Sequence, residues 1–97
     1  MENESVEVMD LYLAAYYLIR GCAIDEVRYI PMGKTAACSL MIRGDRAVIR
    51  EAMEAFFAST AEVNLLAFRN AYNRVNNAVH QAKRNAGAGK ARNGDGL

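Results

Sequence analysis

The 97 residues of this chain are enough for one domain and too few for two. Apolar residues make up 53% of the sequence, so a core can form, while the net charge of +1 gives the whole chain no attraction to nucleic acids or membranes. The charge is uneven, however, because residues 1–62 carry six basic and ten acidic side chains, whereas residues 63–97 carry six basic and one acidic. This asymmetry indicates an anionic partner for the C-terminal part.

The N-terminus shows no targeting pattern. Residues 1–7 are polar and acidic, which predicts a flexible segment and does not match a secretory signal peptide. The longest apolar run, Leu11–Ile19, is far shorter than the roughly 20 residues that a membrane span needs. We therefore expect a cytoplasmic protein without a membrane partner, in which Cys22 and Cys38 remain free thiols.

The first predicted element is a helix from Leu11 to Arg20. Asp10 precedes it as an N-cap residue, and Gly21 follows it at the position where glycine ends helices in the left-handed conformation. The segment is apolar around nearly its whole circumference. A short helix of this kind is either central in its fold or covered by a second subunit.

A β-hairpin is predicted next. Ile24–Ile30 alternates in strand fashion, with Val27 and Tyr29 on one face. The turn is expected at 31–34, with proline in the second turn position and glycine in the fourth. Ala36–Ile42 returns, with one face formed by Cys38, Leu40 and Ile42.

Two helices complete the predicted domain. The second helix spans Arg46–Ala58, with Asp45 as its cap, and its apolar stripe comprises Ile49, Ala52, Met53, Phe56 and Phe57. The third helix runs from Leu65 to about Asn85, with Asn64 as its cap. Its apolar stripe comprises Leu65, Phe68, Tyr72, Val75 and Val79.

These elements predict an α+β fold with the order helix, β-hairpin, helix, long helix (αββαα). Residues 8–85 form the single domain, and the glycine-rich basic residues 86–97 are expected to be a disordered tail. An isolated two-stranded hairpin is only marginally stable and leaves both edges open. We therefore expect a homodimer, formed either by edge pairing or through the apolar first helix.

Two motifs resemble a known family. The first helix opens with Asp10-Leu11-Tyr12-Leu13-Ala14-Ala15, and the last opens with Ala61-x-Val63-Asn64-x-x-x-Phe68. With the hairpin between them, they resemble a family of small bacterial and bacteriophage proteins of unknown function, over roughly residues 10–82. The sequence departs from that pattern at Cys22 and in its second strand, which lacks phenylalanines. The resemblance implies an accessory protein of a phage or mobile element, with no known active site to transfer.

The sequence gives little support for catalysis. Gly33-Lys34-Thr35 resembles the end of a phosphate-binding loop, but the required earlier glycine is Arg28 and a strand follows, so a hairpin turn is the preferred interpretation. Cys22, Cys38 and His80 are too few for a zinc site and lack an evident third group for thiol catalysis. We expect no enzyme activity, no metal and no cofactor.

Two candidate contact surfaces remain. Tyr12, Tyr16 and Tyr17 on the first helix are interpreted mainly as core residues, and alternatively as a partner or dimer surface. The last helix carries basic and amide side chains suited to phosphates and base edges. The residues expected to contact nucleic acid or a partner are Arg69, Asn73, Arg74, Asn77, Lys83 and Arg84. The predicted function is non-catalytic binding of a host or element protein, one outcome being inhibition of a host system. The alternative is nucleic-acid binding through the last helix.

Overall fold

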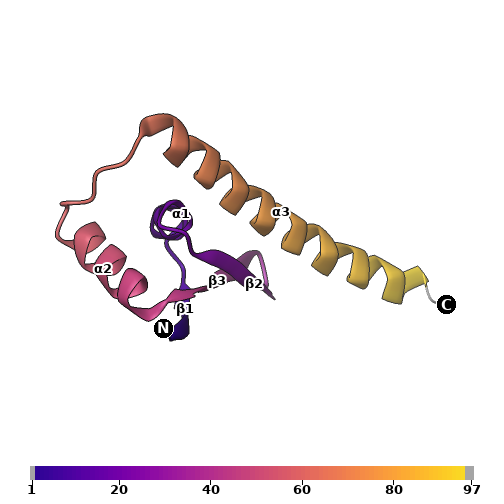
Figure 1. Ribbon diagram of the computed structural model, residues 1–97. Coiled ribbons are helices and arrows are strands. Elements are labelled where there is room, and N and C mark those ends of the chain that lie inside the picture. Colours follow the sequence, from indigo (N-terminus) through magenta and orange to yellow (C-terminus); the bar gives the residue numbers. More distant parts are fainter. Residues whose placement is uncertain (1, 96–97) are drawn as a thin grey trace.

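The computed structural model describes the backbone of residues 2–95 and the side chains of residues 2–86. In this part of the chain the elements are β1 (Asn3–Val8), α1 (Leu11–Ile19), β2 (Ala23–Met32), β3 (Thr35–Asp45), α2 (Arg46–Phe57) and α3 (Leu65–Asp95). The helices gather on one face of a three-stranded antiparallel sheet (Figure 1). The predicted α+β class and the order helix, hairpin, helix, long helix are confirmed, with one strand added at the N-terminus.

The central strand of the sheet is β3, which pairs with β1 on one side and β2 on the other. Apolar residues lie opposite one another across all three strands, with Ile42 between Val6 and Ile24, and Leu40 between Val8 and Val27. Directly opposite residues point to the same face of a sheet. Leu40 and Ile42 are fully buried, so this layer is the floor on which the helices pack.

The N-terminal strand corrects the prediction that residues 1–7 are flexible. Val6 and Val8 alternate with charged residues, and pairing with β3 turns both valines toward the core. On the opposite face of the sheet, the Glu7 carboxylate accepts a 2.7 Å hydrogen bond from the hydroxyl of Ser39. β1 thereby pairs with one edge of the hairpin, an edge for which the sequence analysis predicted no partner within the chain.

The hairpin turn is also placed differently from the prediction. Pro31 belongs to β2 and lies opposite Ala36, and the loop consists of Gly33 and Lys34 between the paired residues Met32 and Thr35. Gly33 has a φ of 65°, which glycine adopts without strain at the first position of a two-residue hairpin loop. Because Pro31 lacks an N–H and β2 is an edge strand, its position blunts that edge against pairing.

The first helix lies at the centre of the molecule, between the sheet, α2 and α3 (Figure 1). The Asp10 carboxylate caps it by accepting the N–H groups of Tyr12 at 2.8 Å and Leu13 at 3.2 Å. Gly21 ends it with a φ of 93°, as predicted. All residues from Leu13 to Leu18 are buried. The chain itself therefore covers the apolar circumference, and no second subunit is needed for that purpose.

The other two helices begin at the predicted caps. Asp45 accepts the N–H groups of the first turn of α2, and the Asn64 side chain accepts the N–H of Ala67 at 3.0 Å in α3. The buried stripes are narrower than predicted. On α2, Met53 and Phe57 are exposed. On α3, Leu65 is 82% exposed, because the first turn of α3 does not pack against α1. Phe68 is the first residue of the predicted α3 stripe that contacts α1, where its ring stacks on that of Tyr12.

The long helix continues past its predicted end near Asn85, with helical backbone as far as Asp95. The predicted tail, residues 86–97, falls mostly outside the described side chains, and residues 96 and 97 lie outside the described chain altogether. Among the helices that the structure describes, none combines the length and the hydropathy required to cross a bilayer.

Candidate binding surfaces

The outward face of α3 carries all six residues that the sequence singled out on this helix. Arg69, Asn73 and Asn77 follow one another at intervals of four residues, so they line one side of the helix. Arg84 lies on the same line, whereas Arg74 and Lys83, nine positions apart, lie on its two opposite flanks. All six side chains are exposed. The opposite side of the helix packs on α1 and β2 through Val75 and its neighbours. We call the six residues the basic ridge.

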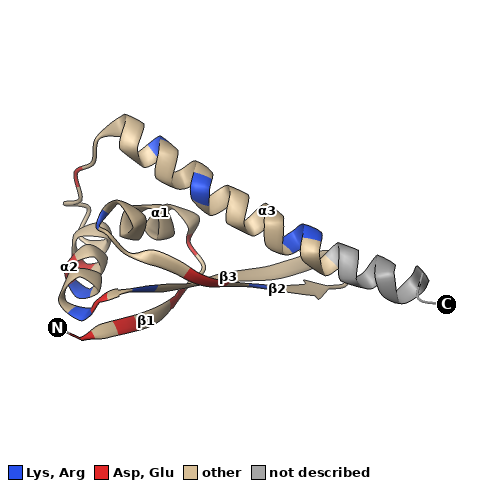
Figure 2. Ribbon diagram, turned by 45° about the vertical axis from the view of Figure 1, so that its right-hand side comes forward, with Lys and Arg blue, Asp and Glu red and all other residues tan. Residues whose placement is uncertain are grey.

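The basic ridge differs from the rest of the surface in its charge. From Leu65 to Ala86 the chain has four Lys and Arg residues and no Asp or Glu. Figure 2 shows basic residues along α3 and both acidic and basic residues on the strands below it. The ion pairs found within residues 2–86 involve Arg20, Arg28, Arg43 and Arg46, none of which is on α3. The positive charge of the ridge is therefore not neutralised by neighbouring carboxylates in the described structure.

A shallow hollow lies on the C-terminal half of the ridge. Asn77, His80, Lys83 and Arg84 line it, and all four belong to α3. Each of these side chains offers a hydrogen-bond donor, and two of them are permanently charged at neutral pH. His80 was not among the predicted contact residues, although its spacing of three residues from Asn77 and Lys83 places it beside them.

The three tyrosines of α1 do not form a common surface. Tyr16 and Tyr17 are buried, in agreement with their interpretation as core residues, and Tyr17 also lines the apolar groove described below. The Tyr16 hydroxyl lies 3.4 Å from a guanidinium nitrogen of Arg20, which donates to it at the edge of the core. Tyr12 is exposed, and its ring stacks against the rings of Tyr72 and Phe68.

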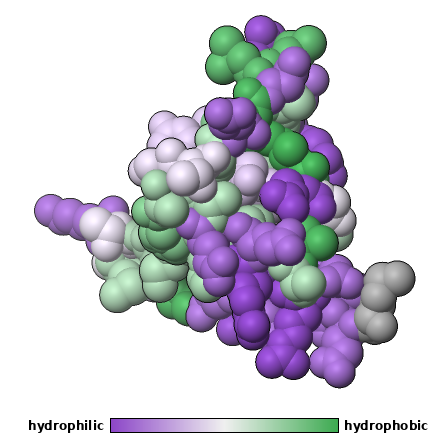
Figure 3. All heavy atoms as spheres, turned by 60° about the vertical axis from the view of Figure 1, so that its left-hand side comes forward, coloured by the Kyte–Doolittle hydropathy of each residue, from purple (hydrophilic) through white to green (hydrophobic). Residues whose placement is uncertain are grey.

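An apolar groove, which sequence reasoning missed, lies where β1, the start of α1 and α2 meet. Seven of its nine lining residues are apolar, namely Val6, Val8, Met9, Leu13, Tyr17, Met53 and Phe57. The other two, Glu7 and Asp10, are both acidic. Further exposed apolar side chains, Val63, Leu65 and Leu66, lie between α2 and α3 and in the first turn of α3. Figure 3 shows that hydrophobic and hydrophilic atoms are mixed on the surface of the molecule. The large apolar residues of α2 cover more of the helix than one buried stripe needs, and this excess, at Met53 and Phe57, is the sequence signal that could have identified the groove.

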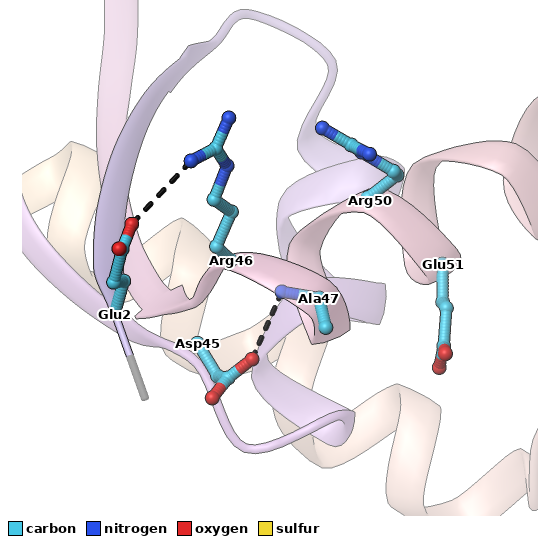
Figure 4. A pocket seen from close by; sticks show the side chains of 6 residues that line it. All are labelled: Glu2, Asp45, Arg46, Ala47, Arg50 and Glu51. Carbon is cyan, nitrogen blue, oxygen red and sulfur yellow. Dashed lines mark hydrogen bonds and ion pairs between the residues drawn. The ribbon is translucent and has the colours of Figure 1, made fainter.

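A second hollow, between β1 and the start of α2, is polar and internally balanced (Figure 4). The Arg46 guanidinium lies 3.4 Å from the Glu2 carboxylate and 3.7 Å from that of Glu4. The Asp45 carboxylate accepts the N–H of Ala47 at 2.9 Å as the helix cap. The Glu51 carboxylate pairs with Arg20, outside the lining, at 3.4 Å. Arg50 is the charged lining residue that none of the ion pairs within residues 2–86 includes, so this hollow offers a ligand little unmatched charge.

The cysteines are not activated. Cys22 is buried, and burial raises the pKa of its thiol, an effect opposed by the positive charge of Arg20 and reinforced by Asp45. Burial also raises the pKa of Cys38. A reactive thiol requires the opposite shift. Within residues 2–86, no group of three or more His, Cys, Asp or Glu side chains is arranged to hold a metal ion.

Comparison with known proteins gives no match to a family model, to a curated protein or to a solved structure. The resemblance of the sequence to small bacteriophage proteins therefore stays a prediction. The chain has two surfaces suited to binding: the apolar groove, with its exposed hydrophobic side chains, and the basic ridge, with its exposed basic and amide side chains.

Proposed function

We propose that this chain acts by non-catalytic binding of a protein partner, and that the apolar groove receives an apolar segment of that partner flanked by Lys or Arg. The observation that carries the proposal is the exposure of large apolar side chains in the groove, where Met9 is 74% and Phe57 70% exposed. Covering one such side chain contributes about 1.5–3 kcal/mol. Contiguous exposed apolar patches on small proteins commonly mark interaction sites.

The groove is held in shape before a partner arrives. The Phe57 ring meets the neighbouring Phe56 ring edge-on, with centroids 5.5 Å apart and an interplanar angle of 88°. Phe56 in turn packs against the core. A side chain that is already positioned loses less conformational entropy on binding, so Phe57 has the properties of an interface anchor.

The charge of the rim selects the chemistry of the occupant. Glu7 and Asp10 are the charged residues of the lining. Their carboxylates accept hydrogen bonds from Ser39 and from the first turn of α1, but no ion pair found within residues 2–86 neutralises either charge. Basic residues beside the apolar segment would meet complementary charge, whereas acidic ones would be repelled. The proposal extends to a cytoplasmic setting and to a host or mobile-element protein as the partner, with inhibition of a host system as one consequence. That extension is supported by the sequence resemblance and the free thiols.

The groove can be tested with the methionine methyl groups as reporters. Met9 and Met53 line the groove, whereas Met32 and Met41 lie on the hairpin. The probe is an amphipathic peptide of Leu and Lys, compared with a Leu and Glu peptide of equal length. We expect the Leu–Lys peptide to shift the NMR signals of Met9 and Met53 selectively, and the Leu–Glu peptide to leave them unchanged.

Paired variants provide the control. Met9→Ser with Phe57→Ser should weaken peptide binding at least tenfold, whereas Ile30→Ser with Met32→Ser, which removes two exposed apolar side chains from the hairpin, should not. Equal shifts at Met9, Met53, Met32 and Met41, or equal losses in both variants, would refute the proposal. Shifts of Met9 and Met53 with protein concentration alone would assign the groove to a second copy of the chain instead, as in the predicted homodimer.

A further inference from the structure

We infer that the basic ridge of α3 is a second binding surface, independent of the apolar groove, and that it contacts the phosphodiester backbone of a nucleic acid. The inference begins with the composition of this helix. A helix face that serves only solubility normally mixes acidic and basic residues, which then form pairs three or four positions apart. From Leu65 to Ala86 this chain has Lys and Arg but no Asp or Glu, so no such pair can form within these residues.

The tertiary structure leaves the ridge uncompensated. Outside α3, the guanidinium groups of Arg20, Arg28, Arg43 and Arg46 lie within 4.0 Å of a carboxylate, as Arg28 does of Glu26 at 2.8 Å, whereas Arg50 is in none of the ion pairs found within residues 2–86. The acidic residue nearest in sequence to the ridge, Glu62, precedes α3, and the pairs found within residues 2–86 include none of the ridge's cations. Uncompensated cations on an exposed face attract polyanions, and each phosphate that a cation neutralises releases bound counterions.

The dimensions and the side chains fit a phosphate backbone. Arg69 and Arg84 are fifteen positions apart, which corresponds to about 22 Å along a helix. Double-stranded DNA carries one charge per roughly 1.7 Å of its axis, so several phosphates lie within that span. The amides of Asn73 and Asn77 and the hollow around His80 add hydrogen-bond donors of the kinds that contact phosphate and sugar oxygens. Because the inner side of α3 is covered by α1 and β2, the outer face is the one available to a nucleic acid.

The uneven charge of the chain orients the molecule on such a ligand. Residues 1–62 carry ten acidic and six basic side chains, whereas the charged residues of α3 from Leu65 to Ala86 are all basic. A polyanion is attracted most strongly by α3, so the ridge faces it. Four cations support a modest, sequence-independent affinity that depends strongly on salt. The expected slope of log affinity against log salt is about −0.9 for each phosphate contacted, or roughly −3 to −4 in total.

The test is fluorescence polarisation with a short labelled DNA duplex, and with duplex RNA and single-stranded DNA of the same length. We expect saturable binding at 50 mM salt that weakens about 100-fold by 200 mM. Arg74→Gln with Arg84→Gln should reduce the salt slope by about 2 and the affinity at least tenfold. The matched control is Lys34→Gln with Arg50→Gln, which removes the same charge from exposed positions outside α3 and should bind as the parent does.

Three results would overturn the inference: no saturable binding to any of the three nucleic acids at 50 mM salt, equal losses in the two double variants, or competition by polyglutamate as strong as that by unlabelled DNA of equal charge. The last result would assign the ridge to an acidic protein surface. The comparison of the three nucleic acids identifies which one is preferred. Because the ridge and the apolar groove share no residue, failure here leaves the peptide experiment unaffected, and the reverse also holds.

Discussion

The ring of Tyr12 in α1 stacks on the ring of Tyr72 in α3, with centroids 5.2 Å apart and an interplanar angle of 15°. The ring of Phe68, one turn earlier in α3, extends the stack, with its centroid 6.2 Å from that of Tyr12. These contacts join the first turn of the central helix to the N-terminal half of the long helix. Tyr12 is therefore part of the helix–helix interface even though much of its surface is exposed.

The Tyr12–Tyr72 contact predicts a measurable coupling energy. Stacked aromatic pairs contribute about 0.5–1.5 kcal/mol beyond the burial of their area. In a double-mutant cycle of Tyr12→Ala and Tyr72→Ala, the two losses in unfolding free energy should differ from additivity by that amount, as measured by urea denaturation. A second cycle, of Tyr12→Ala with Tyr29→Ala on the hairpin, should be additive within about 0.5 kcal/mol. Additivity in both cycles would show that the stacking contributes nothing.

Much of the fold could be predicted because its signals are local. The caps Asp10, Asp45 and Asn64 act on N–H groups two or three residues away, and Gly21 acts on the turn that it ends. Such interactions require no knowledge of the tertiary structure. The hairpin faces were predicted for the same reason, because alternation along a strand assigns its sides.

The strand β1 could not be predicted in this way. The residues of β3 that pair with it lie more than thirty positions later in the chain, so no local pattern links the two strands. The polar composition of residues 1–7 also conceals the alternation of Val6 and Val8 with charged residues. Strand formation there depends on an edge that exists only after the hairpin has folded. The apolar groove was missed for a related reason, since it requires β1 as one wall. The basic ridge was predicted because it lies on a single helix, where spacing alone places residues on one face.

The role of β1 can be tested with two substitutions on the same strand. Val8 is buried against the core, whereas Ser5 points to the open face and is exposed. Val8→Ala removes two buried methyl groups and should lower the unfolding free energy by about 1–3 kcal/mol. Ser5→Ala should change it by less than about 0.5 kcal/mol. If the segment were flexible in solution, both substitutions would have the same small effect in urea denaturation.

A close approach between β3 and the turn after α1 gives another prediction. A Cβ added at Gly44 would lie 2.5 Å from the sulfur of Cys22 and 3.1 Å from its Cβ. Gly44→Ala therefore forces the strand or the cysteine to move, and overpacking of this kind costs about 1–3 kcal/mol. Because the sulfur makes the shorter of these contacts, the same substitution should cost less in a Cys22→Ala background. An equal loss of unfolding free energy in both backgrounds would mean that another contact is responsible.

The buried thiol of Cys22, the half-buried thiol of Cys38 and the Tyr17 hydroxyl predict how stability depends on pH. Burial raises the pKa of Cys22 and Cys38 above the ordinary value of 9.0, and burial, Cys22 and Glu4 together raise the pKa of Tyr17 above 10.0. The folded chain then holds protons that the unfolded chain has released, so the unfolding free energy falls as pH rises above those ordinary values. Below about pH 8 these groups are protonated in both states and contribute no slope.

The pH dependence can be assigned by removing one thiol. A group that is protonated only in the folded state contributes about 1.36 kcal/mol per pH unit to the loss of stability. Urea denaturation of the parent between pH 7 and 10 should show a decline that begins near pH 9, and Cys22→Ala should make that decline shallower. The Cys22 thiol should likewise react with a thiol reagent only after unfolding, because access and ionisation both depend on opening the core. A decline that is unchanged in Cys22→Ala, or rapid labelling of Cys22 in the folded protein, would contradict the buried, protonated state of this thiol.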